Sequence, residues 1–485
     1  MEAALRFAVS AIDLETSAPW LVLVGYAFLI WLMMPARVSA TQFFNGKGKS
    51  DAEPGLLLLV ASAAITWIFA KSIANVANLS AAYGWIGGLG YAAYYLCFVV
   101  VGITIYFIRT RGGWDSLSSF LVAKYGVFCA KLFLAAIAIR LFNEIWSNTK
   151  VGSLYFGAEG SSGYWIAVVA ITAFTLFYSW RGGLRSSLLT DGAQMVLAAV
   201  LLVVVLATVG PGLATNGIPE VSNSTMMAGS TFLFLALVQC LSYGFHDPVM
   251  TDRAFITNPK RMVKGFAMAG LVSGGFILLF SLVGLYSRVQ GLEGAAVVAV
   301  PGAFGLPMLL VFNAIMLTSA GSTLDSTFAS TAKLGARDWC NDYAPATEDH
   351  ALRGRWFMIA IALFGNLPLL SIYLGDHVGP AIIAATTISG TMVMGLAPIF
   401  LLSWIRSAGR LSFHLAFWPG LIFGALLTVE SAIGIAIFPA EFEVGMGKYA
   451  DDLGVNLYGL AICTAGYLLG AAIPTMLSTP RDKIA

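Results

Sequence analysis

The chain has 485 residues, of which 58% are hydrophobic and only 11% are charged, and its mean hydropathy is +0.82. Soluble domains have about 45–50% apolar and about 25% charged residues, so this composition excludes soluble and disordered chains. The net charge of +2 excludes a nucleic-acid partner recruited by bulk charge, and the five scattered cysteines indicate no disulfide framework. The sequence therefore predicts a polytopic membrane protein.

Thirteen stretches are long and apolar enough to cross a bilayer as helices, which takes about 20 residues each. They are residues 18–34, 55–78, 85–108, 128–149, 163–180, 188–209, 228–246, 264–287, 306–335, 355–373, 378–404, 413–438 and 456–475. Residues 110–127 predict a short interfacial helix. The expected fold is all-α, with about thirteen transmembrane helices.

Lys and Arg residues give the expected orientation. If the N-terminus is outside, 21 of the 27 Lys and Arg residues fall on the cytoplasmic side, as the positive-inside rule requires. We expect a multi-pass protein of the plasma (cytoplasmic) membrane, with its N-terminus outside and its C-terminus in the cytoplasm. The longest polar connection, about 336–354, is too short for a catalytic domain, so we do not expect an enzyme.

The second span is unusually polar at its centre. Lys71, Ser72, Asn75 and Asn78 share roughly one helical face by their spacing. Charged side chains are costly at bilayer depth, so Lys71 is a candidate functional residue.

The seventh span ends in Ser242–Pro248, where Gly244 and Pro248 disfavour a helix. Broken backbone inside a membrane is tolerated where it lines a cavity. The alternative is that the span simply ends at Tyr243.

The ninth span places Ser319, Ser322 and Thr323 at i, i+3 and i+4, which brings their oxygens to one face. Together with free carbonyls of an unwound neighbour, these oxygens suit a hard cation. Close helix packing, or hydrogen bonds back to the preceding turn, would use the same residues.

Two further spans contain charged residues. Arg140 and Glu144 are four residues apart in the fourth span, which predicts an internal ion pair. Asp191 falls at the start of the sixth span, where an isolated acid would be favoured by the helix dipole.

Three segments together resemble the sodium:solute symporter (SSS) family. Residues 180–194 (WRGGLRSSLLTDGAQ) are similar to a Gly-Gly-Leu-Arg … Thr-Asp … Gln segment of that family. Residues 322–326 (STLDS) resemble the core of its sodium-binding helix, and residues 247–253 (DPVMTDR) resemble the Gln-Pro-x4-Arg loop of its proline branch. The three segments occur in the expected order and spans.

The resemblance implies a LeuT-like fold, in which two five-helix repeats have inverted topology. Residues 55–209 would form the first repeat and 210–405 the second. Residues 1–54 would then form a peripheral N-terminal helix, and 406–485 two peripheral C-terminal helices with a short cytoplasmic tail.

The resemblance also implies a sodium site and a solute site. The implied sodium ligands are the carbonyls of Ile65, Ile68 and Ser319 and the hydroxyls of Ser322 and Thr323, with Asp191 in the ion pathway. The candidate solute-binding residues are Trp67, Lys71, Ser72, Asn75, Tyr243, Phe245 and His246. Lys71 departs from the family pattern. It could pair with a solute carboxylate, replace a coupling cation, carry a proton or form a structural salt bridge.

We therefore expect a secondary active transporter that couples sodium flow to uptake of a small polar organic solute by alternating access. The solute would be amino-acid-like, a carboxylate or urea-like, and sodium would be the coupling ion, with no other cofactor. One alternative is proton coupling through Lys71 or His246. Others are a solute-sensing membrane module and a passive channel.

Overall fold

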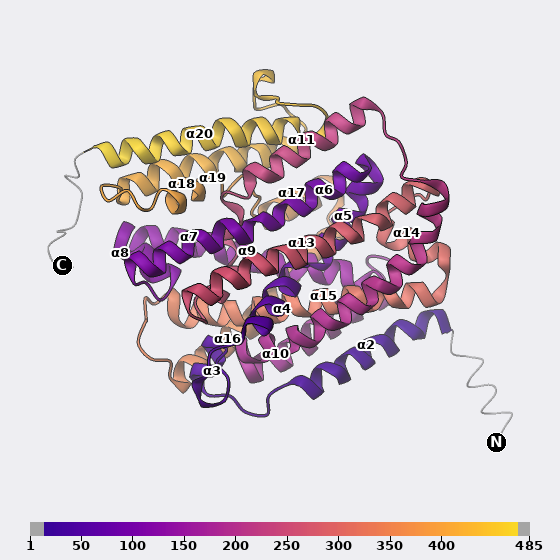
Figure 1. Ribbon diagram of the computed structural model, residues 1–485, viewed down its shortest axis with the longest axis horizontal. Coiled ribbons are helices and arrows are strands. Elements are labelled where there is room, and N and C mark those ends of the chain that lie inside the picture. The colour runs from indigo at the N-terminus through magenta and orange to yellow at the C-terminus, as the bar shows by residue number, and fades with distance from the viewer. Residues whose placement is uncertain (1–13, 474–485) are drawn as a thin grey trace.

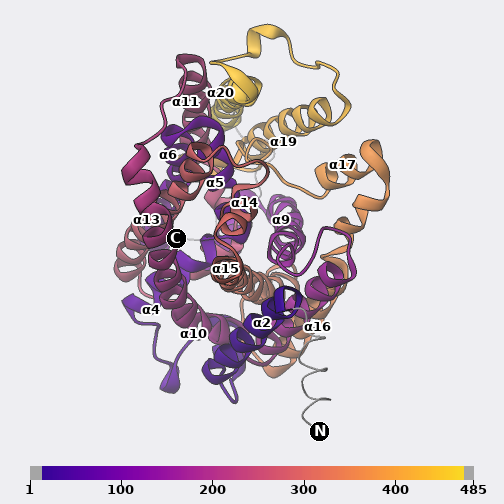
Figure 2. The same cartoon turned by 90° about the vertical axis from the view of Figure 1, so that its right-hand side faces the viewer.

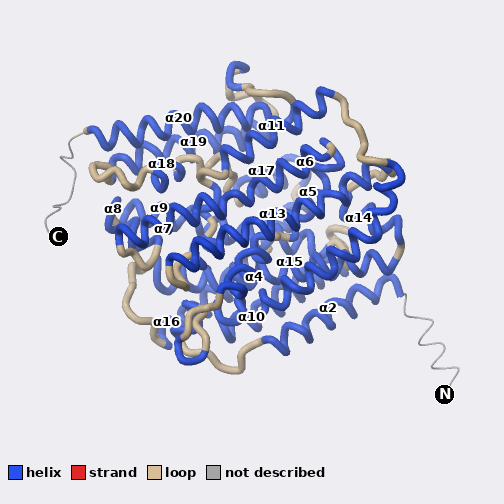
Figure 3. Tube along the Cα trace, in the orientation of Figure 1, coloured by secondary structure: helices blue, strands red, loops and turns tan. Residues whose placement is uncertain are grey.

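The computed structural model describes residues 14–473, which form helices joined by loops, with no strand in that range (Figures 1 and 3). Its α-helices are α2 (Leu14–Met33), α3 (Ala40–Asn45), α4 (Leu56–Trp67), α5 (Ala70–Tyr83), α6 (Trp85–Ala93), α7 (Cys97–Gly112), α8 (Leu117–Tyr125), α9 (Val127–Ser153), α10 (Ser162–Asn216), α11 (Asn223–Gln239), α12 (Pro248–Arg253), α13 (Pro259–Val289), α14 (Ala296–Phe304), α15 (Leu306–Lys333), α16 (Glu348–Phe364), α17 (Gly375–Ala385), α18 (Leu396–Leu401), α19 (Arg410–Ile433) and α20 (Ala450–Ala472).

Among the described residues, eight helices are long and apolar enough to cross a membrane, or nine if the bent pair α4–α5 is one span. The predicted all-α membrane fold is confirmed, while the count of thirteen spans stays a prediction. The 55 residues of α10 would extend about 80 Å, more than twice the hydrocarbon thickness. Its backbone kinks at Gly183, where φ is +51° and ψ is −139°. This kink lies between the two spans predicted at 163–180 and 188–209.

The helical backbone is interrupted at two positions where the sequence predicted membrane spans. α4 ends at Trp67 and α5 starts at Ala70, with a bend of 61° between them. α11 ends at Gln239, and a short 3-10 turn over Tyr243–His246 leads to Asp247, whose side chain caps α12 at the amide of Val249 (3.0 Å). The segment predicted as the seventh span is therefore interrupted, and its helix ends at Gln239, before the Tyr243 of the alternative interpretation.

A close approach explains why Gly244 occupies the second break. A Cβ atom at this position would lie 2.6 Å from Cγ2 of Val101 on α7, closer than side-chain packing allows. The interrupted segment can therefore pack tightly against α7. A short helix, α8, lies within residues 110–127, and its interfacial location stays a prediction.

α15 lies inside the bundle, where it packs against α10, α9 and α16 (Figures 1 and 2). α19 and α20 form a pair at one edge of the molecule, and α2 lies at the opposite edge in both views. These are the helices expected to be peripheral, while the repeat boundaries at residues 55–209 and 210–405 stay a prediction. The arrangement places α15 beside the first break, between α4 and α5.

Candidate functional site

The hydroxyl face of α15 lies against the break between α4 and α5. Ser319 donates a hydrogen bond to the carbonyl of Ile68, the residue at which the helix is interrupted. The hydroxyl of Thr323 lies 3.4 Å from the carbonyl of Thr66 and 3.0 Å from that of Ser319. Backbone carbonyls and hydroxyl oxygens therefore converge at one buried point.

The remaining implied sodium ligands lie at the same junction. Ser322 is fully buried and lies 3.5 Å from the hydroxyl of Thr66. The carbonyl of Ile65 accepts a hydrogen bond from the amide of Ile68 (3.1 Å). Two chain segments about 250 residues apart thus bring together oxygens of the kind that replace an alkali cation's water shell.

Asp191 lies directly beside this junction. It is fully buried within α10 and accepts hydrogen bonds from Ser322 and Ser62, both 2.6 Å long. Arg253 of α12 forms an ion pair with it at 2.9 Å. The expectation that Asp191 sits in the first turn of a helix is wrong, because the second part of α10 starts after the kink at Gly183, eight residues before Asp191. Its charge is balanced by a guanidinium and hydroxyl groups instead of a helix terminus.

A second carboxylate, Asp325, lies on the same face of α15 and is also fully buried. The hydroxyls of Tyr178 and Thr190 on α10 lie 3.0 Å from it. Arg253 links the two carboxylates by donating to the neighbouring hydroxyl of Ser326 (2.6 Å). A polar network therefore connects α4, α10, α12 and α15 on the α4 side of the first helix break.

Replacing Arg253 with Gln should strongly destabilise this network. The change leaves Asp191 buried without its cation, and breaking a buried ion pair in this way costs about 3–5 kcal/mol. Arg261→Gln is the matched control, because Arg261 pairs with Glu53 at the surface, where such pairs contribute about 0–1 kcal/mol. The thermal unfolding midpoint of the purified protein is the measurement. Equal midpoints for the two variants would contradict the prediction.

A cavity of about 690 Å³ opens on the other side of the first break. Its polar lining is Lys71, Ser72, Asn75, Asn78, Arg140, Asn143, Ser147, Gln239, Thr387, Ser389 and Lys448. Its aromatic lining is Trp67, Phe69, Tyr91, Tyr94, Tyr95, Trp146, Phe232, Tyr243, Tyr83 and Tyr449. Small-molecule sites typically combine aromatic walls with convergent polar groups, and this cavity has both.

Four charged residues form one network at the cavity wall. Glu144 pairs with both Lys71 (2.7 Å) and Arg140 (2.5 Å), and Arg140 also pairs with Asp247 (3.0 Å). Lys71 belongs to the helix after the first break, and Asp247 to the second break. Two cations and two carboxylates balance, so a neutral ionic network joins the two broken helices through α9.

The predicted external and cytoplasmic sides of the protein differ in whether the cavity or ion pairs lie there. The cavity extends to Lys448 and Tyr449, which belong to a loop predicted to be external. On the predicted cytoplasmic side, Lys333 at the end of α15 pairs with Asp252 of α12 (2.6 Å) and with Asp338 (3.1 Å). The ionic contacts join α12 to the end of α15 on that side.

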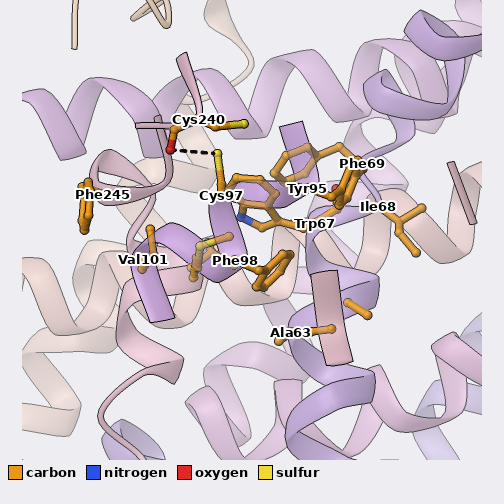
Figure 4. Close-up of a cluster of buried hydrophobic side chains, with 14 of the residues drawn as sticks. Ala63, Trp67, Ile68, Phe69, Tyr95, Cys97, Phe98, Val101, Cys240 and Phe245 are labelled. Carbon is orange, nitrogen blue, oxygen red and sulfur yellow. Dashed lines mark hydrogen bonds between the residues drawn. The ribbon is translucent and has the colours of Figure 1, made fainter. Parts of the chain in front are cut away.

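Aromatic rings surround Trp67 at the base of the cavity. Its indole contacts the rings of Tyr95, Phe98, Phe69 and Tyr243, with centroids 5.2–6.2 Å apart. Figure 4 shows Trp67, Tyr95 and Phe69 close together beside Ile68. The tyrosine hydroxyl of Tyr95 donates to the carbonyl of Trp67 (2.8 Å), which fixes the backbone at the end of α4.

Two predicted solute-binding residues lie elsewhere. Phe245 is fully buried, stacks on Phe400 with centroids 4.5 Å apart, and lies apart from Trp67 in Figure 4. His246 is fully buried too, and its Nδ1 lies 2.5 Å from the carbonyl of Tyr243. Neither residue lines the cavity. The other five candidates, Trp67, Lys71, Ser72, Asn75 and Tyr243, all line it.

Several residues at the site were not predicted. Gln239 and the hydroxyls of Tyr91 and Tyr94 line the cavity, and Thr66 lies beside the α15 hydroxyls. An isolated amide in an apolar span is a functional signal, so Gln239 could have been identified. Thr66 could not, because isolated threonines in membrane helices usually bond to their own backbone.

Comparison with protein-family models and with curated proteins gives no match. Among solved structures, the chain is similar to a sodium-coupled sialic acid symporter in a substrate-bound, outward-open state, whose structure revealed a novel sodium site. The TM-score is 0.68 at 15% identity, covering 94% of this chain and 98% of the other. It is also similar to Mhp1, a nucleobase-cation-symport-1 transporter in a closed conformation with bromovinylhydantoin bound, with a TM-score of 0.54 at 14% identity over 90% and 95% of the two chains. The chain therefore has the fold of LeuT-like transporters.

Proposed function

We propose that this chain is a member of the sodium:solute symporter family that couples sodium flow to uptake of a small polar organic solute. The observation that carries the proposal is the convergence of the Ser319, Ser322 and Thr323 oxygens on the broken end of α4. Both similar structures are of cation-coupled transporters, which supports symport as the general activity.

The proposed mechanism uses the first helix break twice. Sodium binds between α4 and α15, where it holds the break against the hydroxyl face. The same break supplies Trp67 and Lys71 to the cavity wall, so ion binding orders the solute site. A ligand shifts a conformational equilibrium only through its different affinity for the two states, and this shared break provides that difference.

Alternating access would follow from movement of the broken helices against their neighbours. In the proposed outward-facing state, the cavity opens towards the loop with Lys448 and Tyr449, and the Lys333 ion pairs hold the cytoplasmic side closed. Closure over the solute and release of those ion pairs would open the other side. The proposed orientation has the N-terminus outside.

The cavity chemistry favours a solute with both charge and hydrogen-bonding groups. Lys71 is 18% exposed and already paired with Glu144, so a solute carboxylate would share this cation. Amides from Asn75, Asn143 and Gln239 would bind the solute's polar atoms. Amino-acid-like, carboxylate and urea-like solutes all satisfy this arrangement.

A thermal-shift screen of the purified protein with candidate solutes, with and without sodium, tests this function. A correct solute at a concentration 100 times its Kd should add about 2.7 kcal/mol to stability in sodium. Choline at equal ionic strength is the control and should reduce that gain. A gain that is identical in sodium and choline would contradict sodium coupling. If such a gain instead follows pH, it would favour the proton-coupled alternative through Lys71 or His246.

A further inference from the structure

A second cavity lies between the end of α7, α8 and α18. Its volume is about 600 Å³, and its lining includes Ile103, Phe107, Arg111, Ala123, Lys124 and Trp404. The labels of α7, α8 and α18 lie on the same side of the molecule in Figure 1. This cavity shares no lining residue with the cavity assigned to the solute.

An apolar track on α7 leads into this cavity. Val99, Ile103 and Phe107 are 39%, 49% and 43% exposed, and their spacing of four places them on one helical face. In a membrane protein, exposed apolar side chains of a spanning helix face lipid chains. Arg111 continues the same spacing, so the apolar track ends at a cation.

The end of the apolar track at Arg111 has residue types that are typical of the membrane–water interface. The Arg111 guanidinium stacks over Phe107, 4.4 Å from the ring centroid, and among the described residues no carboxylate is within ion-pair distance of it. Lys124 supplies a second cation on the facing helix and donates to the carbonyl of Ile405 (3.0 Å). Trp404, which is 69% exposed, flanks the opening, as tryptophans commonly do at this depth.

Arg109, in the same turn of α7 as Arg111, has a structural role that allows a comparison with Arg111. Its guanidinium points inward and donates to the carbonyls of Ala254 and Thr257, both at 2.7 Å. Arg111, two residues later, has no such partners in the described part of the chain and lines the cavity instead. Helix packing therefore explains Arg109 and leaves Arg111 available to an external anion.

We propose that this cavity binds an anionic phospholipid. Its phosphate lies between Arg111 and Lys124, and one acyl chain follows the Ile103–Phe107 face. A soluble phosphate would make no use of the apolar track, and a zwitterionic lipid would gain less from two cations. The site is independent of the proposed transport function, since it requires no residue of the solute or sodium site.

Native mass spectrometry of the full chain, titrated with phosphatidylglycerol or with phosphatidylcholine of the same acyl chains, tests the proposal. Each cation near the surface favours an anionic lipid about fivefold, so Arg111→Gln with Lys124→Gln should weaken phosphatidylglycerol binding about 25-fold. Ala123→Trp, which fills the cavity without changing charge, should also weaken it. The control, Lys260→Gln with Lys264→Gln, removes two exposed cations from α13 and should leave binding unchanged.

Three results would overturn the proposal. The first is equal affinity of the native chain for the two lipids. The second is phosphatidylglycerol binding by the Arg111→Gln, Lys124→Gln protein at the native affinity. The third is displacement of bound lipid by glycerol phosphate at equal concentration, because the site would then recognise a free phosphate without its acyl chains.

Discussion

A protein in which Ser322 and Thr323 are both alanine should require about 100-fold more sodium for half-maximal uptake or stabilisation. Each hydroxyl is fully buried beside the broken end of α4, so its removal deletes one oxygen from the proposed ion shell. A hydrogen-bonding group that interacts with a charge contributes about 1.5–3 kcal/mol. At the lower figure, loss of two such ligands weakens sodium binding about 100-fold. The measurement is sodium titration of thermal stability, followed by sodium-dependent uptake.

The control for this experiment is Thr318→Ala with Thr331→Ala. Both residues are on α15 and buried, and each hydroxyl donates to the preceding turn, to Ala314 (2.7 Å) and Thr327 (2.8 Å). The control therefore removes two buried hydroxyls from the same helix without touching the proposed ion shell. If both double variants show the same sodium dependence as the native chain, sodium does not bind at Ser322 and Thr323.

Local spacing explains why part of this site could be predicted. Ser319, Ser322 and Thr323 lie within five residues of one helix, so their shared face follows from helical geometry alone. The polar face of Lys71, Ser72 and Asn75 follows in the same way, and all three line the cavity. The helical period alone therefore predicts that each of these two sets of residues shares one helix face.

Long-range contacts explain why the rest could not be predicted. Asp191 and Arg253 are 62 residues apart, and Arg140 and Asp247 are 107 apart, so no local period links either pair. Phe245 follows Gly244 in the second break, and its ring could have faced the cavity or the core. The packing of Phe400 against it settles that direction, and Phe400 is 155 residues further along the chain.

Replacing Glu144 with Gln should cause the second large effect, a loss of about 3–5 kcal/mol of stability. Glu144 is 1% exposed and serves both Lys71 and Arg140, so its neutralisation leaves two cations facing each other with only Asp247 to balance them. Glu159→Gln is the control, because it breaks the half-exposed Lys150–Glu159 pair. The thermal unfolding midpoint is the measurement, and a loss no greater than in the control would contradict the prediction.

Adding Lys71→Met to Glu144→Gln separates charge balance from solute binding. The double variant removes one cation with one carboxylate and leaves the Arg140–Asp247 pair at 3.0 Å, so it should recover more than half of the lost stability. Solute binding should not recover with it, because Lys71 lines the cavity and is the cation that a solute carboxylate would share. If stability and solute binding return together, Lys71 serves only to neutralise Glu144. If stability does not return, Glu144 acts mainly through Arg140, since the variants differ only at Lys71.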